Sequence, residues 1–135
     1  MELVLTGAQT EVLLVHLHIM RKSIKNVLKR NYGAFEGKRL LKVYDSTKDL
    51  LNDKIRLLTA NEECSYDLEE EQLEIVHSFL LMFFQKVEGE IKDKVTKSKE
   101  QEKVREHMQL TLLEEVQAKI NILYAATKEG ASVVR

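Results

Sequence analysis

The sequence of 135 residues contains no proline and no tryptophan, and it has only five glycines. Proline and glycine are the residues that most often interrupt regular secondary structure, so their scarcity favours long helices. Two of the five glycines fall in the segment 31–37 (NYGAFEG), which is the one strong turn signal in the first half of the chain. The composition therefore predicts an all-α protein.

The chain also lacks the features of a secreted or membrane-spanning protein. Its one cysteine, Cys64, has no partner for an internal disulfide, which fits a reducing cytoplasm. No apolar run approaches the roughly 18–20 residues that span a bilayer. Residues 1–11 have neither the basic segment nor the cleavage site of a secretory signal. A net charge of −1 gives no overall attraction to nucleic acid or to a membrane. We expect a cytoplasmic protein with no membrane partner.

What the chain does contain is apolar side chains at helical spacing. Leu13, Leu17 and Met20 begin a stripe that continues along one helix face, and later segments repeat this pattern. Hydrophobic residues make up 44% of the sequence, enough for the core of a single helical domain over residues 1–135. The pattern predicts helices at about residues 7–32, 38–59, 67–95 and 100–127.

The helix ends carry local signals of their own. Thr6 and Gln9 have the spacing of a capping box ahead of the first helix, and Gly33 is placed to close it. Asp67 has the side chain to cap the third helix, whose first turn is acidic. The pattern leaves open whether residues 1–5 and 38–44 are helical or extended.

A second open point is whether the third and fourth helices are separate. Residues 96–103 contain no apolar side chain. The nine positions from Val95 to Val104 turn a helix by about 900°, which leaves the two apolar stripes on opposite sides. We therefore predict a turn near residues 96–100, although no glycine marks it. Four helices with short connections predict an antiparallel four-helix bundle.

Two sequence patterns that contain histidine suggest metal binding, but neither provides the residues that one ion requires at suitable positions. His16 and His18 are two positions apart, so on a helix their side chains point about 200° from each other and cannot bind one ion. Glu74 and His77 form an E-x-x-H pair, as in di-iron carboxylate bundles, but those sites need a second such pair and two further glutamates. We expect no metal, and no cofactor of any other kind.

Two acidic pairs, Glu71-x-x-Glu74 and Glu90-x-x-Asp93, resemble the motifs of the all-α nucleotide pyrophosphatases (the MazG-like enzymes). In that family, carboxylates from two antiparallel helices converge on Mg²⁺. Here both pairs fall within one predicted helix, about 28 Å apart. Cys64 follows two glutamates, which disfavour an activated thiolate. We expect no catalytic residue and no enzymatic activity.

Charge placement is the most informative feature of the sequence. Residues 21–42 hold eight basic side chains and one acidic one, whereas residues 62–74 are strongly acidic. Helices that alternate in direction would bring the first and third turns to the same end, forming a basic pole. The residues that we expect to bind a partner there are Arg30, Lys38, Arg39, Lys42, Lys97 and Lys99. Lysines suit helix C-termini, but those at the start of the second helix have no such explanation.

These patterns predict a regulatory or protein–protein interaction module whose basic pole binds a protein with an acidic surface. Residues 12–20 and the run FLLMFF at residues 79–84 are apolar on all sides, so we also expect a homodimer. The alternative is a small regulator that binds nucleic acid or another polyanion through the same pole. A Mg²⁺-dependent pyrophosphatase-like enzyme is the remaining alternative.

Overall fold

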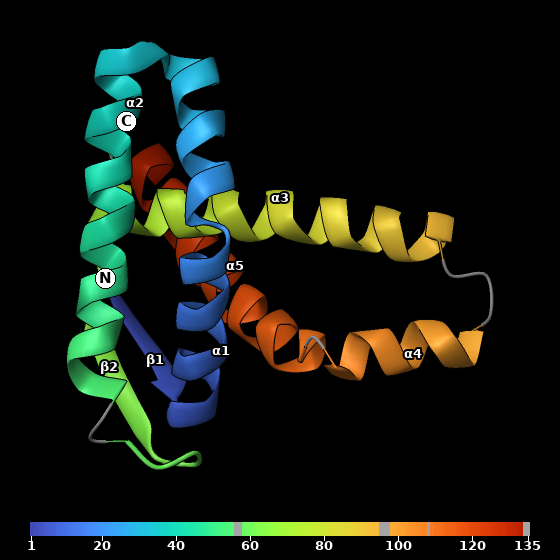
Figure 1. Cartoon of the computed structure of the whole chain (residues 1–135). Helices are drawn as coiled ribbons and strands as arrows, with labels where there is room; N and C mark the ends of the chain where they lie inside the picture. Colours follow the sequence, from blue (N-terminus) through green and yellow to red (C-terminus); the bar gives the residue numbers. More distant parts are fainter. Residues whose placement is uncertain (56–57, 95–97, 108, 134–135) are drawn as a thin grey trace.

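The computed structural model describes residues 1–55, 58–94, 98–107 and 109–133. This part of the chain folds in the order β1 (Glu2–Thr6), α1 (Gly7–Ile19), α2 (Arg21–Ile55), β2 (Glu63–Asp67), α3 (Glu70–Lys94), α4 (Ser98–His107) and α5 (Leu110–Val133). Helices dominate, as predicted, and a small two-stranded sheet accompanies them (Figure 1). None of the helices in the described ranges combines the length and apolar character that a membrane span requires.

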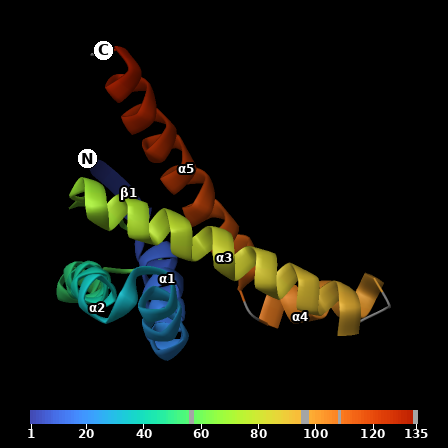
Figure 2. The same cartoon turned by 90° about the horizontal axis from the view of Figure 1, so that it is seen from above.

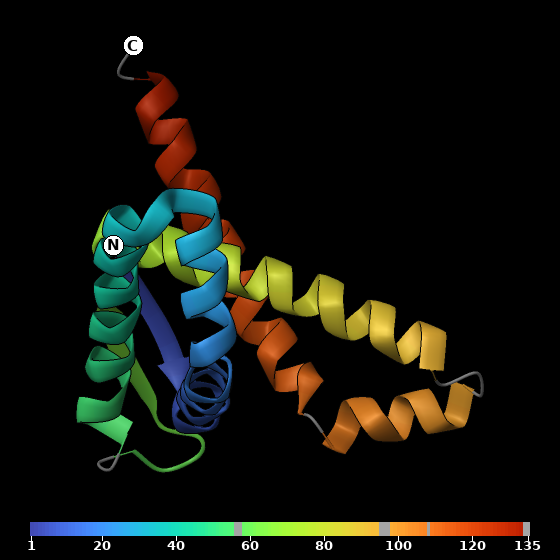
Figure 3. The same ribbon diagram turned by 45° about the horizontal axis from the view of Figure 1, so that its top comes forward.

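The longest helix, α2, folds back on itself at Gly33. This glycine has φ 84° and ψ 175°, a conformation that L side chains rarely adopt. We call residues 21–32 the first arm and residues 34–55 the second arm. The two arms lie side by side and run in opposite directions (Figures 1 and 3). The predicted turn at residues 31–37 is therefore confirmed, and residues 38–44, which the sequence left open, are helical.

The predicted first helix is interrupted at Met20, which ends α1 before α2 begins at Arg21. Beside this break, the buried hydroxyl of Tyr44 in the second arm donates a hydrogen bond to the carbonyl oxygen of Leu17. The single helix expected over residues 7–32 is thus two helices. A contact between residues 27 positions apart accompanies the break, and helical periodicity does not reveal such a contact.

The small sheet joins the start of the chain to the segment before α3. β1 and β2 are antiparallel, with Leu3 opposite Tyr66 and Leu5 opposite Cys64. Leu3, Leu5 and Tyr66 are buried and alternate with more exposed neighbours, as in a strand with one face on the core. Residues 1–5, left open by the sequence, are extended from Glu2 onward.

The start of α3 differs from the prediction because residues 63–67 form β2. Asp67 is the last residue of β2 and does not cap the helix. The helix begins at Glu70, and the side-chain oxygen of Gln72 accepts a hydrogen bond from the backbone N–H of Glu69. Glu70 and Glu71 occupy the first turn, where negative charge is favoured.

The capping box at the start of α1 is confirmed, and it also anchors α5. The Thr6 hydroxyl accepts from the backbone N–H of Gln9, and the Gln9 side chain accepts from the backbone N–H of Thr6. The same Gln9 oxygen accepts a hydrogen bond from Lys119 of α5, at 2.8 Å. Lys119 also donates to the carbonyl oxygen of Val4, so one lysine links α5 to both β1 and α1.

The helices are not confirmed as a four-helix bundle. α3 crosses α1 and both arms of α2 steeply, and with α4 it extends away from them (Figures 1 and 2). The run at residues 79–84 explains this position: Phe79 packs against Tyr44 of the second arm, and Phe83 packs against His16 of α1. α3 buries Phe79, Phe83 and Phe84, and within this run only Leu81 is classed as exposed.

The predicted fourth helix consists of α4 and α5. Gln109, with φ 54°, lies between them and turns the chain. Arg105 on α4 forms ion pairs with Glu88 of α3 and Glu114 of α5 and so holds the three helices together. α3 ends at Lys94 and α4 begins at Ser98. The third and fourth predicted helices are therefore separate. Part of the predicted turn lies outside the described residues, and residues 98–100 are helical.

Candidate functional site

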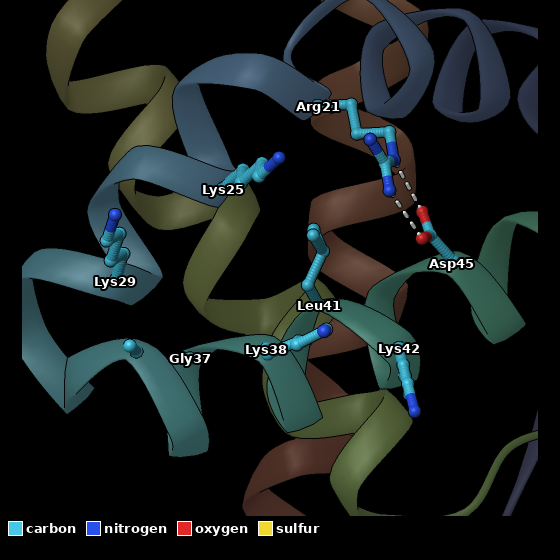
Figure 4. A pocket seen from close by; sticks show the side chains of 9 residues that line it. Arg21, Lys25, Lys29, Gly37, Lys38, Leu41, Lys42 and Asp45 are labelled. Carbon is cyan, nitrogen blue, oxygen red and sulfur yellow. Dashed lines mark hydrogen bonds and ion pairs between the residues drawn. The ribbon is translucent and has the colours of Figure 1, made fainter.

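The two arms of α2 enclose a cleft of about 530 Å³ that we call the basic groove. Its lining comprises Arg21, Lys25, Lys29, Ala34, Gly37, Lys38, Leu41, Lys42 and Asp45 (Figure 4). Positions 21, 25 and 29 recur every four residues along the first arm, and positions 38, 41, 42 and 45 share a face of the second. The helical repeat and the turn at Gly33 therefore bring two basic rows together.

At the end nearest the turn, the arms touch. Gly37 is buried, and a side-chain Cβ built on it would lie 2.8 Å from the carbonyl oxygen of Leu28. That distance is shorter than real Cβ contacts, so only glycine lets the second arm approach the backbone of the first so closely. This contact joins the two arms at the part of the basic groove next to the turn.

The other end is closed by an ion pair between the arms. The Nε and Nη2 atoms of Arg21 donate to the two carboxylate oxygens of Asp45, each at 2.8 Å. These hydrogen bonds from Arg21 lower the pKa of Asp45, and the same contact raises the pKa of Arg21. Asp45 is the only acidic side chain in the lining that the structure describes, and its charge is already compensated.

The four lysines of the groove have no such partner. Lys25, Lys29, Lys38 and Lys42 are exposed, and within the described ranges none of them forms a hydrogen bond or an ion pair. Two come from each arm, and all four line the same cleft. Their charges are therefore available to an anionic ligand.

The predicted partner-binding residues do not all belong to this groove. Lys38 and Lys42 line it. Arg30 is exposed on the first arm but outside the lining. Arg39 binds Glu36 and Glu71 on another side of the second arm, and these hydrogen bonds raise its pKa.

The described residues do not bring the two lysine groups of the expected basic pole together. Because α3 crosses the arms, the C-terminal end of α3 and the start of α4 lie far from the turn at Gly33 (Figures 1 and 3). Lys99 is exposed on α4, away from the basic groove, and Lys97 lies outside the described residues. Arg21, Lys25 and Lys29 belong to the basic stretch of residues 21–42 but were not among the expected partner-binding residues. Their four-residue spacing places them on one face of a helix. That face becomes part of a site only because the second arm lies opposite it.

Two of the histidines, His16 and His77, have packing roles in this structure. The ring of His16 lies 2.7 Å from the carbonyl oxygen of Val12, whereas His18 is exposed near Lys48. His77 stacks on Tyr124 with ring centroids 3.9 Å apart. In the described part of the chain, no group of three or more His, Cys, Asp or Glu residues is arranged to hold a metal ion. Independence from metal stays a prediction.

The two acidic pairs that resemble pyrophosphatase motifs both lie on α3, as the sequence predicted. Nineteen residues separate their first members, so they are about 28 Å apart along the helix axis. Oxygens that bind one Mg²⁺ lie about 2.0–2.1 Å from it. Within this chain the pairs cannot share an ion.

The ion pair at the end of the groove gives a prediction for acid stability. Because the pKa of Asp45 is lowered, its contribution is fully present above the ordinary aspartate pKa of about 3.9 and is lost as the pH falls through the lowered value. Asp45→Asn should therefore lower the free energy of unfolding at neutral pH. The difference in this free energy between the variant and wild type should shrink below about pH 4. Urea denaturation across pH measures this. The control Asp49→Asn changes an exposed residue one turn away, and its difference in unfolding free energy from wild type should not shrink at low pH. If this difference depended on pH in the same way for both variants, the prediction would be contradicted.

The chemistry of the groove is that of binding. Its lining contains no serine, cysteine or histidine that could act as a nucleophile or as a general base near neutral pH. Lysine and arginine side chains hold carboxylates and phosphates through charge-assisted hydrogen bonds. Comparisons of the chain with protein-family models, curated proteins and solved structures gave no match.

Proposed function

We propose that the chain is a non-enzymatic helical module that binds an acidic surface of a partner protein through the basic groove. One observation carries this proposal: four exposed lysines, for which the described part of the chain supplies no ion-pair partner, line a single cleft from two arms. An anionic partner that enters the cleft gains attractive interactions with these charges. The single cysteine fits the reducing cytoplasm that we propose as the location.

The floor of the groove favours a protein partner over nucleic acid. Ala34, Gly37 and Leu41 are small or apolar, and they suit side-chain packing better than contact with a phosphate backbone. Aromatic side chains, on which bases stack, are absent from this lining. Phe35 lies beside the groove at the turn and is 88% exposed, as expected of an aromatic anchor at a protein interface.

Reversing two of the groove lysines tests the proposal. Lys38→Glu with Lys42→Glu should weaken the binding of a fluorescent polyglutamate peptide at least about tenfold, because both attractive charges become repulsive. Fluorescence anisotropy measures the affinity. The matched control is Lys22→Glu with Arg30→Glu, which makes the same charge change on exposed sites of the first arm outside the groove. This control should keep most of the affinity.

Circular dichroism should show the same helix content in wild type and both variants. Equal binding by the wild-type protein and the groove variant, with the fold intact, would show that the groove is not the site. Tighter binding of a DNA oligonucleotide than of polyglutamate, with a steep salt dependence, would support the polyanion alternative instead.

We also propose that the chain is a homodimer, joined through a ridge formed by Val15 and Ile19 on α1. These side chains are 45% and 67% exposed, four positions apart on one helix face. A cleft lies on each side of the ridge: one is bordered by Lys48 and Asp49, and the other by Lys86 and Glu90. Each cleft thus offers one acid and one base, which suits the self-complementary contact of a two-fold dimer.

A further inference from the structure

The shape of the basic groove constrains what binds in it. Its walls are two antiparallel helices in contact at Gly37, and two packed helices leave an outer furrow into which a third helix fits. The lining between the two basic rows includes Ala34, whose single methyl group leaves room for another backbone, and the apolar side chain of Leu41. We propose that the partner segment is an acidic α-helix that lies in this furrow and completes a three-helix assembly with the two arms. This rests on the proposed function.

The lysine spacing supports a helix in this position. Lys25 and Lys29 on one wall, and Lys38 and Lys42 on the other, are each separated by one helical turn, about 6 Å along the axis. A bound helix presents acidic side chains at the same interval on both flanks of a narrow stripe of small residues. Each flank then meets one wall.

An extended acidic peptide fits this arrangement less well. Its side chains alternate between opposite faces, so one row faces the floor while the other faces solvent. The floor is apolar, and carboxylates directed into it would lose water without gaining a cation. A helix instead keeps its acidic residues beside the lysines and its small residues over Ala34.

The turn at Gly33 and the ion pair between Arg21 and Asp45 set the length of the bound helix. The groove extends along the second arm from Ala34 to Asp45, where the ion pair with Arg21 crosses it. Eleven steps of about 1.5 Å give about 17 Å, or three helical turns. Isolated helices this short are marginally stable in water. The segment therefore either belongs to a folded partner or folds when it binds.

Two fluorescent peptides of equal composition test this proposal. One carries glutamates on both flanks of an alanine stripe and is held helical by a side-chain lactam. The other carries the same residues with alternating D-amino acids that prevent a helix. The helical peptide should bind at least about tenfold more tightly by fluorescence anisotropy.

The variant Ala34→Phe fills the floor without changing any charge. It should weaken binding of the helical peptide about tenfold. Asn26→Phe places the same ring on an exposed site of the first arm outside the groove and should leave the affinity unchanged. Circular dichroism checks the fold of both variants.

Each other outcome has a distinct meaning. Equal affinity for the two peptides, or an undiminished affinity in Ala34→Phe, would overturn the helix inference and leave the proposed function standing. Binding of neither peptide by the wild-type protein would contradict the proposed function itself. Tighter binding of a DNA oligonucleotide than of either peptide would overturn both.

Discussion

Replacing Gly37 by alanine should lower the free energy of unfolding by about 1–3 kcal/mol, although alanine has the higher helix propensity. The new Cβ would lie 2.8 Å from the carbonyl oxygen and 2.9 Å from the carbonyl carbon of Leu28. Both are backbone atoms, which cannot rotate away as a side chain does. The two arms must therefore separate, and their contact within the basic groove is lost.

Gly89 provides the matched control, because it also lies within a helix but has open space around it. No atom of the described residues lies within 4 Å of a Cβ built there. Gly89→Ala should therefore raise the free energy of unfolding by about 0.5–1 kcal/mol through helix propensity alone. Urea denaturation followed by circular dichroism measures both variants. An equal change in the free energy of unfolding of both variants would mean that the packing of the arms does not depend on contact at Gly37.

The features that the sequence predicted correctly are local. The capping box of Thr6 and Gln9 spans four residues, and the turn at Gly33 depends on a conformation that glycine adopts readily. The opposite directions of His16 and His18 follow from the helical repeat. In each case neighbouring positions contain the whole physical cause, so no knowledge of the tertiary structure is needed.

The features that the sequence did not predict depend on distant contacts. β1 pairs with β2 some sixty residues away, and the five residues of β2 (ECSYD) alternate too briefly to outweigh a helical interpretation. The direction in which α3 crosses the other helices depends on the elements against which its aromatic side chains pack. The antiparallel bundle assumed that consecutive helices lie alongside one another, and that assumption also created the basic pole.

The candidate site shows the same division. The sequence identified Lys38 and Lys42, because bases at the start of a helix need an explanation. It grouped them with Arg39, but Glu71, which lies 32 positions further along, binds Arg39 in the structure. The opposing Lys25 and Lys29 become site residues only because Gly33 reverses the chain. The sequence shows how many basic residues each segment contains. It does not show toward which neighbour each basic side chain points.

The homodimer is the second prediction with a large expected effect. Light scattering after gel filtration should give twice the monomer mass at tens of micromolar protein. Ile19→Glu places a carboxylate at the centre of the proposed ridge, where dimerisation would remove it from water. An unpaired buried charge of this kind costs several kcal/mol, so the dissociation constant should rise at least about a hundredfold. The variant should be monomeric at the same concentration.

Ile122→Glu is the control for a new charge on an exposed isoleucine. Ile122 lies on α5 and is 71% exposed, against 67% for Ile19, so the two substitutions cost the folded monomer a similar amount. Only Ile19 lies on the ridge between the two clefts. The Ile122 variant should therefore remain a dimer. A monomeric wild-type protein, or dissociation by both variants alike, would contradict the proposed interface and leave Val15 and Ile19 as ordinary exposed apolar side chains.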